Sequence, residues 1–294
     1  MSDYPQAFDY VHSTLHLWRE NGIDLRATRS ALERLQAGGN VAPMAKREAP
    51  APKAIPASAN RETAHVAESS PPAVIPNIEA SRLAPADGSK AQRLAAMREP
   101  VLACTKCPHL VKSRTQVVFG VGNPHAELMF VGEAPGEDED KQGEPFVGKA
   151  GQLLTRIIET MGLSRDTVYI ANVLKCRPDM PPGVSGNRKP ELKEMQTCLP
   201  YLREQIDIIQ PSAIVALGAT ALEGLTGQNT PVGKVRGKWL ELQGIPLMVT
   251  FHPAYLLRNQ SITEKRKVWD DMLLVMEKLG HAISEKQRTY FARG

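Results

Sequence analysis

The chain has 294 residues, which is enough for one or two domains with a substantial core. Apolar residues make up 42% and charged residues 23%, as in ordinary soluble proteins, and a net charge of +4 permits a nucleic-acid partner without indicating one. No apolar run approaches the roughly 20 residues of a membrane-spanning helix, and the first residues lack the pattern of a secretory signal. We therefore expect a cytoplasmic protein with no membrane partner, in which disulfides are rare.

The N-terminal third is expected to lie apart from the main domain. Apolar residues recur at helical spacing from Phe8 to Trp18, and a second run stops at Gly38, so residues 1–39 predict a small helical hairpin. Such a hairpin fits a partner-binding module and a weakly folded tail equally well. Residues 40–92 are rich in Ala and Pro without periodicity, and we expect a disordered linker because they bury too little apolar surface.

The remaining chain predicts an α/β domain over residues 93–280, followed by a C-terminal tail at 281–294. Short apolar strands are expected at 127–132, 168–174, 213–218 and 246–251, and helices at 152–161, 190–209, 219–225 and 263–279. Apolar strands that alternate with helices indicate a parallel sheet covered on both faces.

Polar segments follow the predicted strands at 132–151, 172–190 and 252–259. Ligands bind at the carboxyl ends of strands in such sheets. The first segment is too long for a simple connection, and long ordered loops are usually functional. Its acidic run, Glu137 to Asp140, taken alone indicates only a solvated loop.

Two polar residues at strand ends have both structural and functional interpretations. Asn172 lies in an otherwise apolar strand, where its amide must bond either to neighbouring backbone or to a ligand. His252 begins a His-Pro sequence after the fourth strand, and by itself this is weak support for anything beyond a structural role.

The four cysteines are Cys104, Cys107, Cys176 and Cys198. The first two form a C-x-x-C before the sheet, the third follows the second strand, and the last lies in the next helix. Four thiolates suit zinc or an iron–sulfur cluster, and buried reduced thiols are a third interpretation. The spacing alone does not decide among them.

Taken together, these segments closely resemble the iron–sulfur-containing uracil-DNA glycosylases, family 4 of that superfamily. The resemblance covers residues 95–280 and rests on Cys104-x-x-Cys107, GEAPGEDEDKQGEPFVGKAGQLL at 132–154, YIANVLKCRP at 169–178, Cys198 and HPAYLL at 252–257. It implies a three-layer α/β/α fold with a four-stranded parallel sheet. The chain departs from the family in a longer segment between Cys176 and Cys198, where we expect a surface loop.

The resemblance implies an enzyme that flips uracil out of DNA and hydrolyses its N-glycosidic bond, leaving an abasic site. It implies a [4Fe–4S] cluster on the four cysteines, with a structural role favoured over a redox role. The implied base pocket consists of Glu133, Ala134, Pro135, Phe146, Asn172 and His252.

The chemistry assigns a role to each main pocket residue. Phe146 would stack on the base, Asn172 would read O4 and N3–H, and His252 would donate to O2 of the leaving uracil. Ala134 stands where many uracil glycosylases carry a water-activating Asp, so Glu133 is the nearest acidic candidate for that role.

The DNA contacts are expected on the segment that begins with His252. Leu256 or Leu257 would fill the vacated base stack, and Arg258 would contact phosphates. The basic run 265–267 fits phosphate contacts and a solvated helix face equally well. Uracil-containing DNA is the expected partner of a monomer, and the N-terminal hairpin is a candidate site for a protein partner.

Two other functions compete with the enzyme. One is a non-catalytic uracil-DNA binding or polymerase-associated module, and the other is a covalent relative that traps uracil through a basic, histidine-containing insertion. Residues 183–193 contain no histidine, so the covalent relative ranks below the hydrolase.

Overall fold

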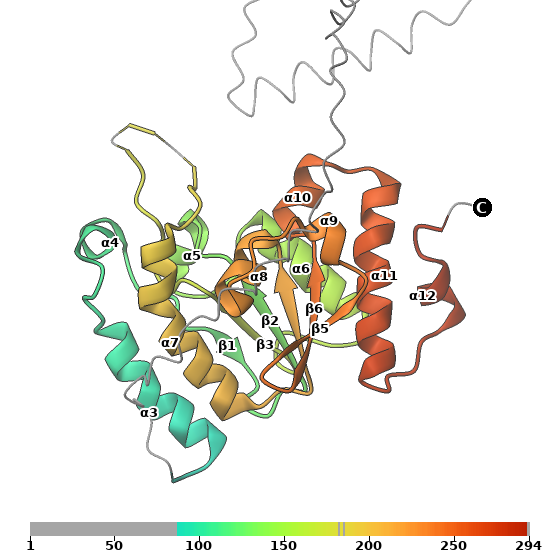
Figure 1. The fold of residues 1–294 in the computed structure, drawn as a ribbon, viewed down its shortest axis with the longest axis horizontal. Helices are drawn as coiled ribbons and strands as arrows, with labels where there is room; N and C mark the ends of the chain where they lie inside the picture. The colour runs from blue at the N-terminus through green and yellow to red at the C-terminus, as the bar shows by residue number, and fades with distance from the viewer. Residues whose placement is uncertain (1–86, 182, 185, 293–294) are drawn as a thin grey trace, which may run out of the picture. The chain divides into compact units, whose positions relative to one another are not determined.

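The computed structural model describes residues 87–292 except 182 and 185 (Figure 1). Its helices are α3 (Lys90–Leu102), α4 (Pro108–Ser113), α5 (Glu137–Gln142), α6 (Lys149–Thr160), α7 (Leu192–Ile209), α8 (Ala219–Thr226), α9 (Val232–Val235), α10 (Pro253–Arg258), α11 (Ile262–Lys278) and α12 (Glu285–Thr289). Its strands are β1 (Val121–Gly122), β2 (Leu128–Gly132), β3 (Tyr169–Asn172), β4 (Ala213–Leu217), β5 (Trp239–Leu242) and β6 (Ile245–Thr250). The expected hairpin at 1–39 and nearly all of the expected linker lie outside the described residues.

The sheet has six strands in the order β1-β3-β2-β4-β6-β5. The four predicted strands form its centre and pair in parallel, whereas β1 and β5 pair antiparallel at the two edges. The predicted α/β class is confirmed, but the predicted four-strand count is wrong. The edge strands escaped prediction because β1 has two residues and β5 is only partly buried, so neither forms an apolar run.

Helices cover both faces of the sheet, as the strand pattern required. Along β2, Met129 and Val131 belong to the core shared with α3, α7 and α8, while Leu128 and Phe130 belong to the core shared with α6 and α11. Figure 1 shows α3 and α7 on one side of the sheet and α11 on the other. Alternate side chains of a fully buried strand thus supply two hydrophobic cores.

Both expected ends of the domain are extended by the structure. Helix α3 begins at Lys90, inside the expected linker, because Ser89 caps it and the Lys90 ammonium donates to the carbonyl of Ile209. The expected C-terminal tail contains α12, whose Gln287 side chain donates to the carbonyl of Thr160 at 2.8 Å. Within the described part of the chain, no helix is long and apolar enough to cross a bilayer.

Candidate active site

The carboxyl ends of β2 and β3 bring Gly132 and Asn172 into register as neighbours. A Cβ on Gly132 would overlap both the Asn172 side-chain oxygen and the Phe146 ring, so only glycine lets these two groups close over the strand end. The Phe146 ring in turn lies 5.6 Å, centroid to centroid, from the His252 ring. Three predicted pocket residues from three segments therefore meet at one edge of the sheet.

Asn172 presents a buried acceptor with nothing to accept from. Its side chain is 2% exposed, and Oδ1 has no hydrogen-bond partner among the described residues. Leaving a buried polar atom unpaired costs about 1–3 kcal/mol. The structural interpretation, in which neighbouring backbone satisfies this oxygen, is thus wrong for Oδ1, and a ligand donor is the natural partner.

His252 caps α10 and has a defined tautomer. Its Nδ1 accepts a hydrogen bond from the Ala254 amide at 3.1 Å, which leaves the proton of the neutral ring on Nε2. Burial lowers the pKa of His252 to about 4, and the positive charge of Arg258 acts in the same direction. At neutral pH this residue is therefore a neutral Nε2–H donor.

The acidic run after β2 forms helix α5, and one of its carboxylates organises the pocket loop. Glu139 Oε1 accepts from the amides of Val147 at 3.0 Å and Gly148 at 2.9 Å, and its Oε2 accepts from the amide of Gly136 at 3.0 Å. The interpretation of this run as a solvated loop is wrong for Glu139, which holds the residues directly after Phe146. The third position of a short helix is where such a carboxylate reaches back to the cap, and this signal was present in the sequence.

Arg165 holds the same loop from its carbonyl side. Its guanidinium donates to the carbonyls of Phe146 at 3.1 Å and Pro145 at 2.7 Å. Phe146 has a φ of 56°, a conformation that is strained for an aromatic residue and persists only where its surroundings enforce it. Glu139 and Arg165 supply that enforcement, and no sequence motif pointed to Arg165.

The segment Glu133–Pro135 continues from β2 along the pocket edge. The carbonyl of Glu133 accepts from the Leu174 amide at 3.0 Å, which fixes the backbone beyond the strand. Pro135 is buried and Ala134 partly buried. The Glu133 carboxylate is partly exposed and has no hydrogen-bond partner within the described chain, so it is available to a ligand or a water.

The four cysteines gather where α4, the end of β3 and α7 meet, and all are free thiols. Cys176 is 7% and Cys198 6% exposed. Burial raises the pKa of Cys107, Cys176 and Cys198, and the charge of nearby Cys104 raises each further, for Cys198 to about 12. A metal or cluster bound here must displace these protons.

Three donors point at the sulfur atoms. Arg114 donates to Cys176 Sγ at 3.0 Å, the Tyr201 hydroxyl to Cys104 Sγ at 3.2 Å, and the backbone amide of Lys175 to Cys198 Sγ at 3.2 Å. Hydrogen bonds to sulfur are a means by which proteins tune iron–sulfur clusters, so this set fits one.

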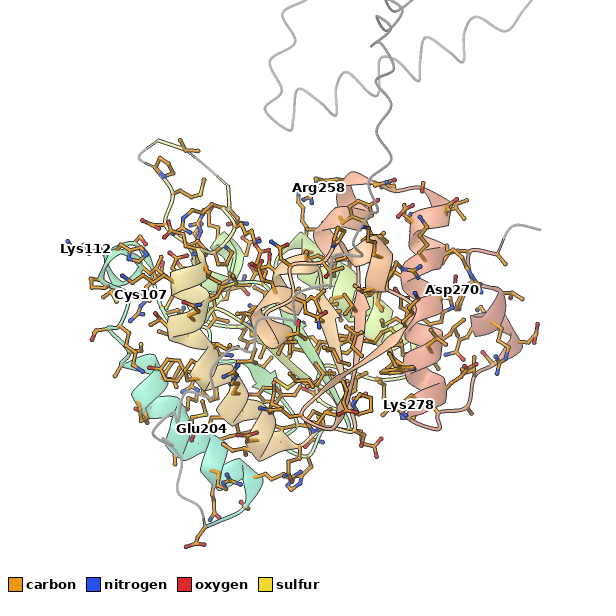
Figure 2. All side chains as sticks on the ribbon, viewed as in Figure 1. Cys107, Lys112, Glu204, Arg258, Asp270 and Lys278 are labelled. Atoms are coloured by element: carbon orange, nitrogen blue, oxygen red, sulfur yellow. The ribbon has the colours of Figure 1, made fainter. Side chains whose placement is uncertain are left out.

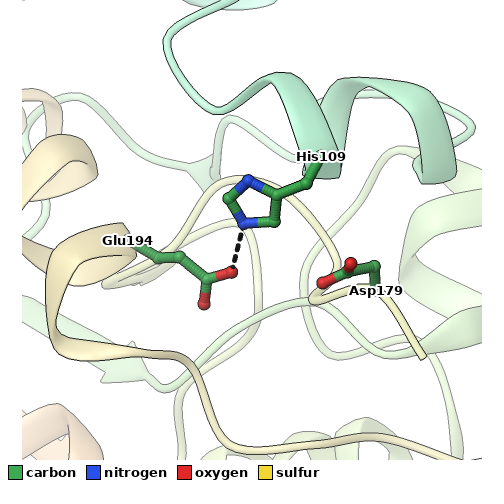
Figure 3. Close-up of side chains that lie close together, drawn as sticks. All are labelled: His109, Asp179 and Glu194. Carbon is green, nitrogen blue, oxygen red and sulfur yellow. Dashed lines mark hydrogen bonds and ion pairs between the residues drawn. The ribbon is translucent and has the colours of Figure 1, made fainter. Parts of the chain in front are cut away.

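An ion-pair network braces the segment between the last two cysteines. His109 Nε2 lies 2.8 Å from Glu194 Oε1, with Asp179 beside them, and their donor atoms lie within 4.8 Å of one another (Figure 3). The Arg188 guanidinium bonds to both carboxylates. Because an arginine already balances these charges, we interpret the cluster as a brace between α4 and α7 rather than as a cation site.

Comparison with known proteins gives a consistent family. The model of the uracil DNA glycosylase superfamily matches residues 119–273. A type-4 uracil-DNA glycosylase of Thermotoga maritima is 49% identical over 177 residues, 59% of this chain and 88% of the relative. Those of Sulfurisphaera tokodaii and Archaeoglobus fulgidus are 45% and 40% identical, over 67% and 65% of this chain and 90% and 94% of the relatives.

The chain belongs to the uracil-DNA glycosylase superfamily. The sequence motifs resemble family 4, and the relatives reported above are type-4 uracil-DNA glycosylases, so the predicted family is confirmed. The residues predicted to contact DNA lie on α10 and α11.

Helix α10 presents one leucine outward and one inward. Leu256 is 4% exposed and lines an apolar cavity of about 240 Å³ between α6 and α11, so it packs inside the glycosylase domain. Leu257 is partly exposed and Arg258 exposed. Figure 2 shows Arg258 projecting at the end of α10, well separated from Cys107. Leu257 and Arg258 thus stay candidates for DNA contact, and Leu256 does not.

Two of the three basic side chains in the run 265–267 on α11 already bond to other groups of this chain. Arg266 pairs with Asp270 at 2.8 Å and donates to the carbonyl of Tyr290 at 2.7 Å, and Lys267 pairs with Glu264 at 2.7 Å. These contacts favour the structural interpretation of the run over phosphate binding.

Proposed function

We propose that this chain excises uracil from DNA by rotating the nucleotide into the pocket at the ends of β2 and β3. Membership of the superfamily and its type-4 relatives make it a uracil-DNA glycosylase, a hydrolase of N-glycosyl bonds that acts in DNA repair. The observation that carries the pocket assignment is the unpaired Asn172 Oδ1 beside the Phe146 ring. A flipped base would lie between the Phe146 ring and the Asn172 side chain, and it would donate a hydrogen bond to that oxygen.

The pocket groups discriminate uracil from cytosine by their hydrogen-bond pattern. Asn172 Oδ1 would accept from uracil N3–H while the side-chain amide donates to O4. Cytosine presents an acceptor and a donor in the reversed places, so both Asn172 groups would stay unpaired in a buried site. Sites of this kind reject the wrong partner strongly.

Bond cleavage needs stabilisation of a departing anion and of a cationic sugar. His252 Nε2–H would donate to O2 as negative charge builds on the departing uracil, and the neutral ring keeps this N–H because its Nδ1 accepts from the Ala254 amide. Glu133, with its free carboxylate, would orient the attacking water. Phosphates of the bound DNA would help to stabilise the sugar, by analogy with glycoside hydrolysis.

A [4Fe–4S] cluster on Cys104, Cys107, Cys176 and Cys198 is the cofactor that we propose. The support is the donor set of four thiols and the three donors aimed at their sulfur atoms. When bound, the cluster would supply a covalent cross-link among these segments and an electron-accepting centre. Brown colour and four irons per chain are expected after anaerobic purification, and stoichiometric zinc in a colourless protein would contradict the assignment.

The proposed pocket is complete within one chain, which supports a monomer, and we propose that it acts in the cytoplasm on single- or double-stranded DNA. The test is release of free uracil from oligonucleotides that carry one uracil, measured beside the Asn172→Ala variant. We expect rapid release by the wild type and little by the variant. Tight binding without release would indicate a non-catalytic binding module, and DNA retained on the denatured protein would indicate a covalent trap.

A further inference from the structure

Lys175 lies between the base pocket and the cysteines and is 1% exposed. Its Nζ donates to the main-chain carbonyl of Asn172 at 3.0 Å and to Gln205 Oε1 at 2.6 Å. Its own backbone amide donates to Cys198 Sγ at 3.2 Å. One buried residue therefore contacts both the residue that reads the base and a predicted cluster ligand.

The far end of this arrangement is fixed by Gln205. This side chain is fully buried, and its Nε2 donates to the carbonyl of Phe119 at 3.0 Å and to the Tyr169 hydroxyl at 3.2 Å. Because its amide is bound on both sides, Gln205 Oε1 presents a stationary acceptor to Lys175. Gln205 and Cys198 share one face of α7, so the lysine side chain and its backbone are held by the same helix.

Both acceptors of the Lys175 ammonium are neutral oxygens. Burying such a group is costly unless its hydrogen bonds are made. The bonds to the Asn172 carbonyl and to Gln205 are therefore the contacts that hold this side chain in place.

We propose that Lys175 is a positioning residue that holds the main chain of Asn172 in its base-reading position. This inference rests on the proposed function and cofactor. It assigns the lysine a role in linking the two sites, because its side chain contacts Asn172 and its backbone amide contacts Cys198 in α7.

The test uses Lys175→Met in the full-length protein, because methionine keeps the length of the side chain but removes its donors and charge. Single-turnover uracil release should fall about 10- to 100-fold, since small misplacements at a reacting centre cost up to about 10² in rate. Iron content and affinity for abasic DNA, which lacks the base, should be unchanged.

A double-mutant cycle separates positioning from general damage. If Lys175 acts through Asn172, adding Lys175→Met to Asn172→Ala should slow uracil release no further. The matched control is Lys90→Met, which also removes a lysine-to-carbonyl bond, to Ile209 at 2.7 Å, but one that involves neither Asn172 nor Cys198. This control should excise uracil at the wild-type rate.

Two results would overturn the proposal. One is wild-type excision by Lys175→Met, and the other is an equal slowing in the wild-type and Asn172→Ala backgrounds. If Lys175→Met is isolated without iron, Gln205→Met decides instead, because it removes the acceptor that fixes the lysine. Wild-type excision by iron-loaded Gln205→Met would then refute the role.

The proposed function can fail separately from this inference. If the wild type releases no uracil, or if Asn172→Ala matches the wild type, the base-reading assignment itself is wrong. If the wild type releases uracil and Asn172→Ala does not, the result for Lys175 bears on the coupling alone.

Discussion

At the scale of single residues, the proposed pocket presents hydrogen-bonding groups that are held at fixed positions. Asn172 Oδ1 is buried without a partner among the described residues, and His252 is locked as a neutral donor by the amide of Ala254. Neither group carries a formal charge at neutral pH. Under the proposed function, uracil recognition in this pocket would therefore depend on the direction of hydrogen bonds.

Removing the His252 donor should slow bond cleavage without weakening DNA binding. For His252→Ala we expect single-turnover uracil release to fall about 10²–10³-fold, the usual cost of losing one donor to a developing anion. Affinity for abasic DNA should hold, because no base is present to accept. Excision at the wild-type rate would show that the leaving-group site lies elsewhere.

The pH dependence of stability should reveal the buried state of His252. Its folded pKa of about 4 lies below the usual value, so between roughly pH 6.5 and 4 the unfolded chain binds a proton that the folded chain excludes. The folded state should therefore lose stability over this range as pH falls, and show no loss from this group above it. Unfolding temperatures of the wild type and His252→Gln across pH 4–8 measure it, and parallel curves would contradict the assignment.

At the scale of elements, the loop between α5 and α6 is shaped by two long side chains from outside it. Glu139 binds its amides and Arg165 binds its carbonyls, with Phe146 strained between them. A Cβ at Gly151 would overlap the Phe146 backbone, so α6 closes directly against this loop. The aromatic wall of the pocket is thus set by α5, α6 and the segment before β3.

Weakening the Glu139 contacts should affect the base pocket selectively. Glu139→Gln keeps the size but loses the charge that serves three backbone amides, and bonds to charged groups contribute about 1.5–3 kcal/mol each. We expect kcat for uracil release to fall about tenfold, with iron content unchanged. Glu137→Gln on the exposed face of α5 is the matched control, and an equal loss in both variants would exclude a specific role for Glu139.

The two leucines of α10 should respond differently to truncation. Leu256→Ala leaves a hole in a packed region and should destabilise the fold by about 2–4 kcal/mol. Leu257→Ala should leave the unfolding temperature nearly unchanged but slow excision more from double-stranded than from single-stranded DNA, since only a duplex has a stack to fill. Equal effects on both substrates would argue against insertion of Leu257.

At the scale of the whole molecule, every predicted pocket and cluster residue lies in the described domain. Cys104 is the first of them along the chain and His252 the last in the pocket. Deleting residues 1–86 should therefore leave iron content and uracil release on short oligonucleotides nearly unchanged. A large loss of activity by a folded, iron-loaded truncation would show that the N-terminal segment contributes to the site.

The sequence by itself determined the sheet centre and the family, and it supplied the candidate residues of the pocket. Buried parallel strands are continuous apolar runs, so β2, β3, β4 and β6 were visible, and the motifs at their ends carried the resemblance. Edge strands such as β1 and β5 have no such run because β1 has only two residues and β5 is only partly buried. They were invisible for that reason.

Only the tertiary structure decided how those residues are used. Whether Leu256 or Leu257 faces outward depends on how α10 packs against its neighbours, and both leucines look alike in the sequence. Arg165 and Lys175 both donate to main-chain carbonyls, Arg165 to that of Pro145 and Lys175 to that of Asn172. Every residue has such a carbonyl, so the residue types in the sequence do not indicate these contacts. The sequence gives the chemistry of each side chain, but the packing of the fold decides which backbone groups that side chain contacts.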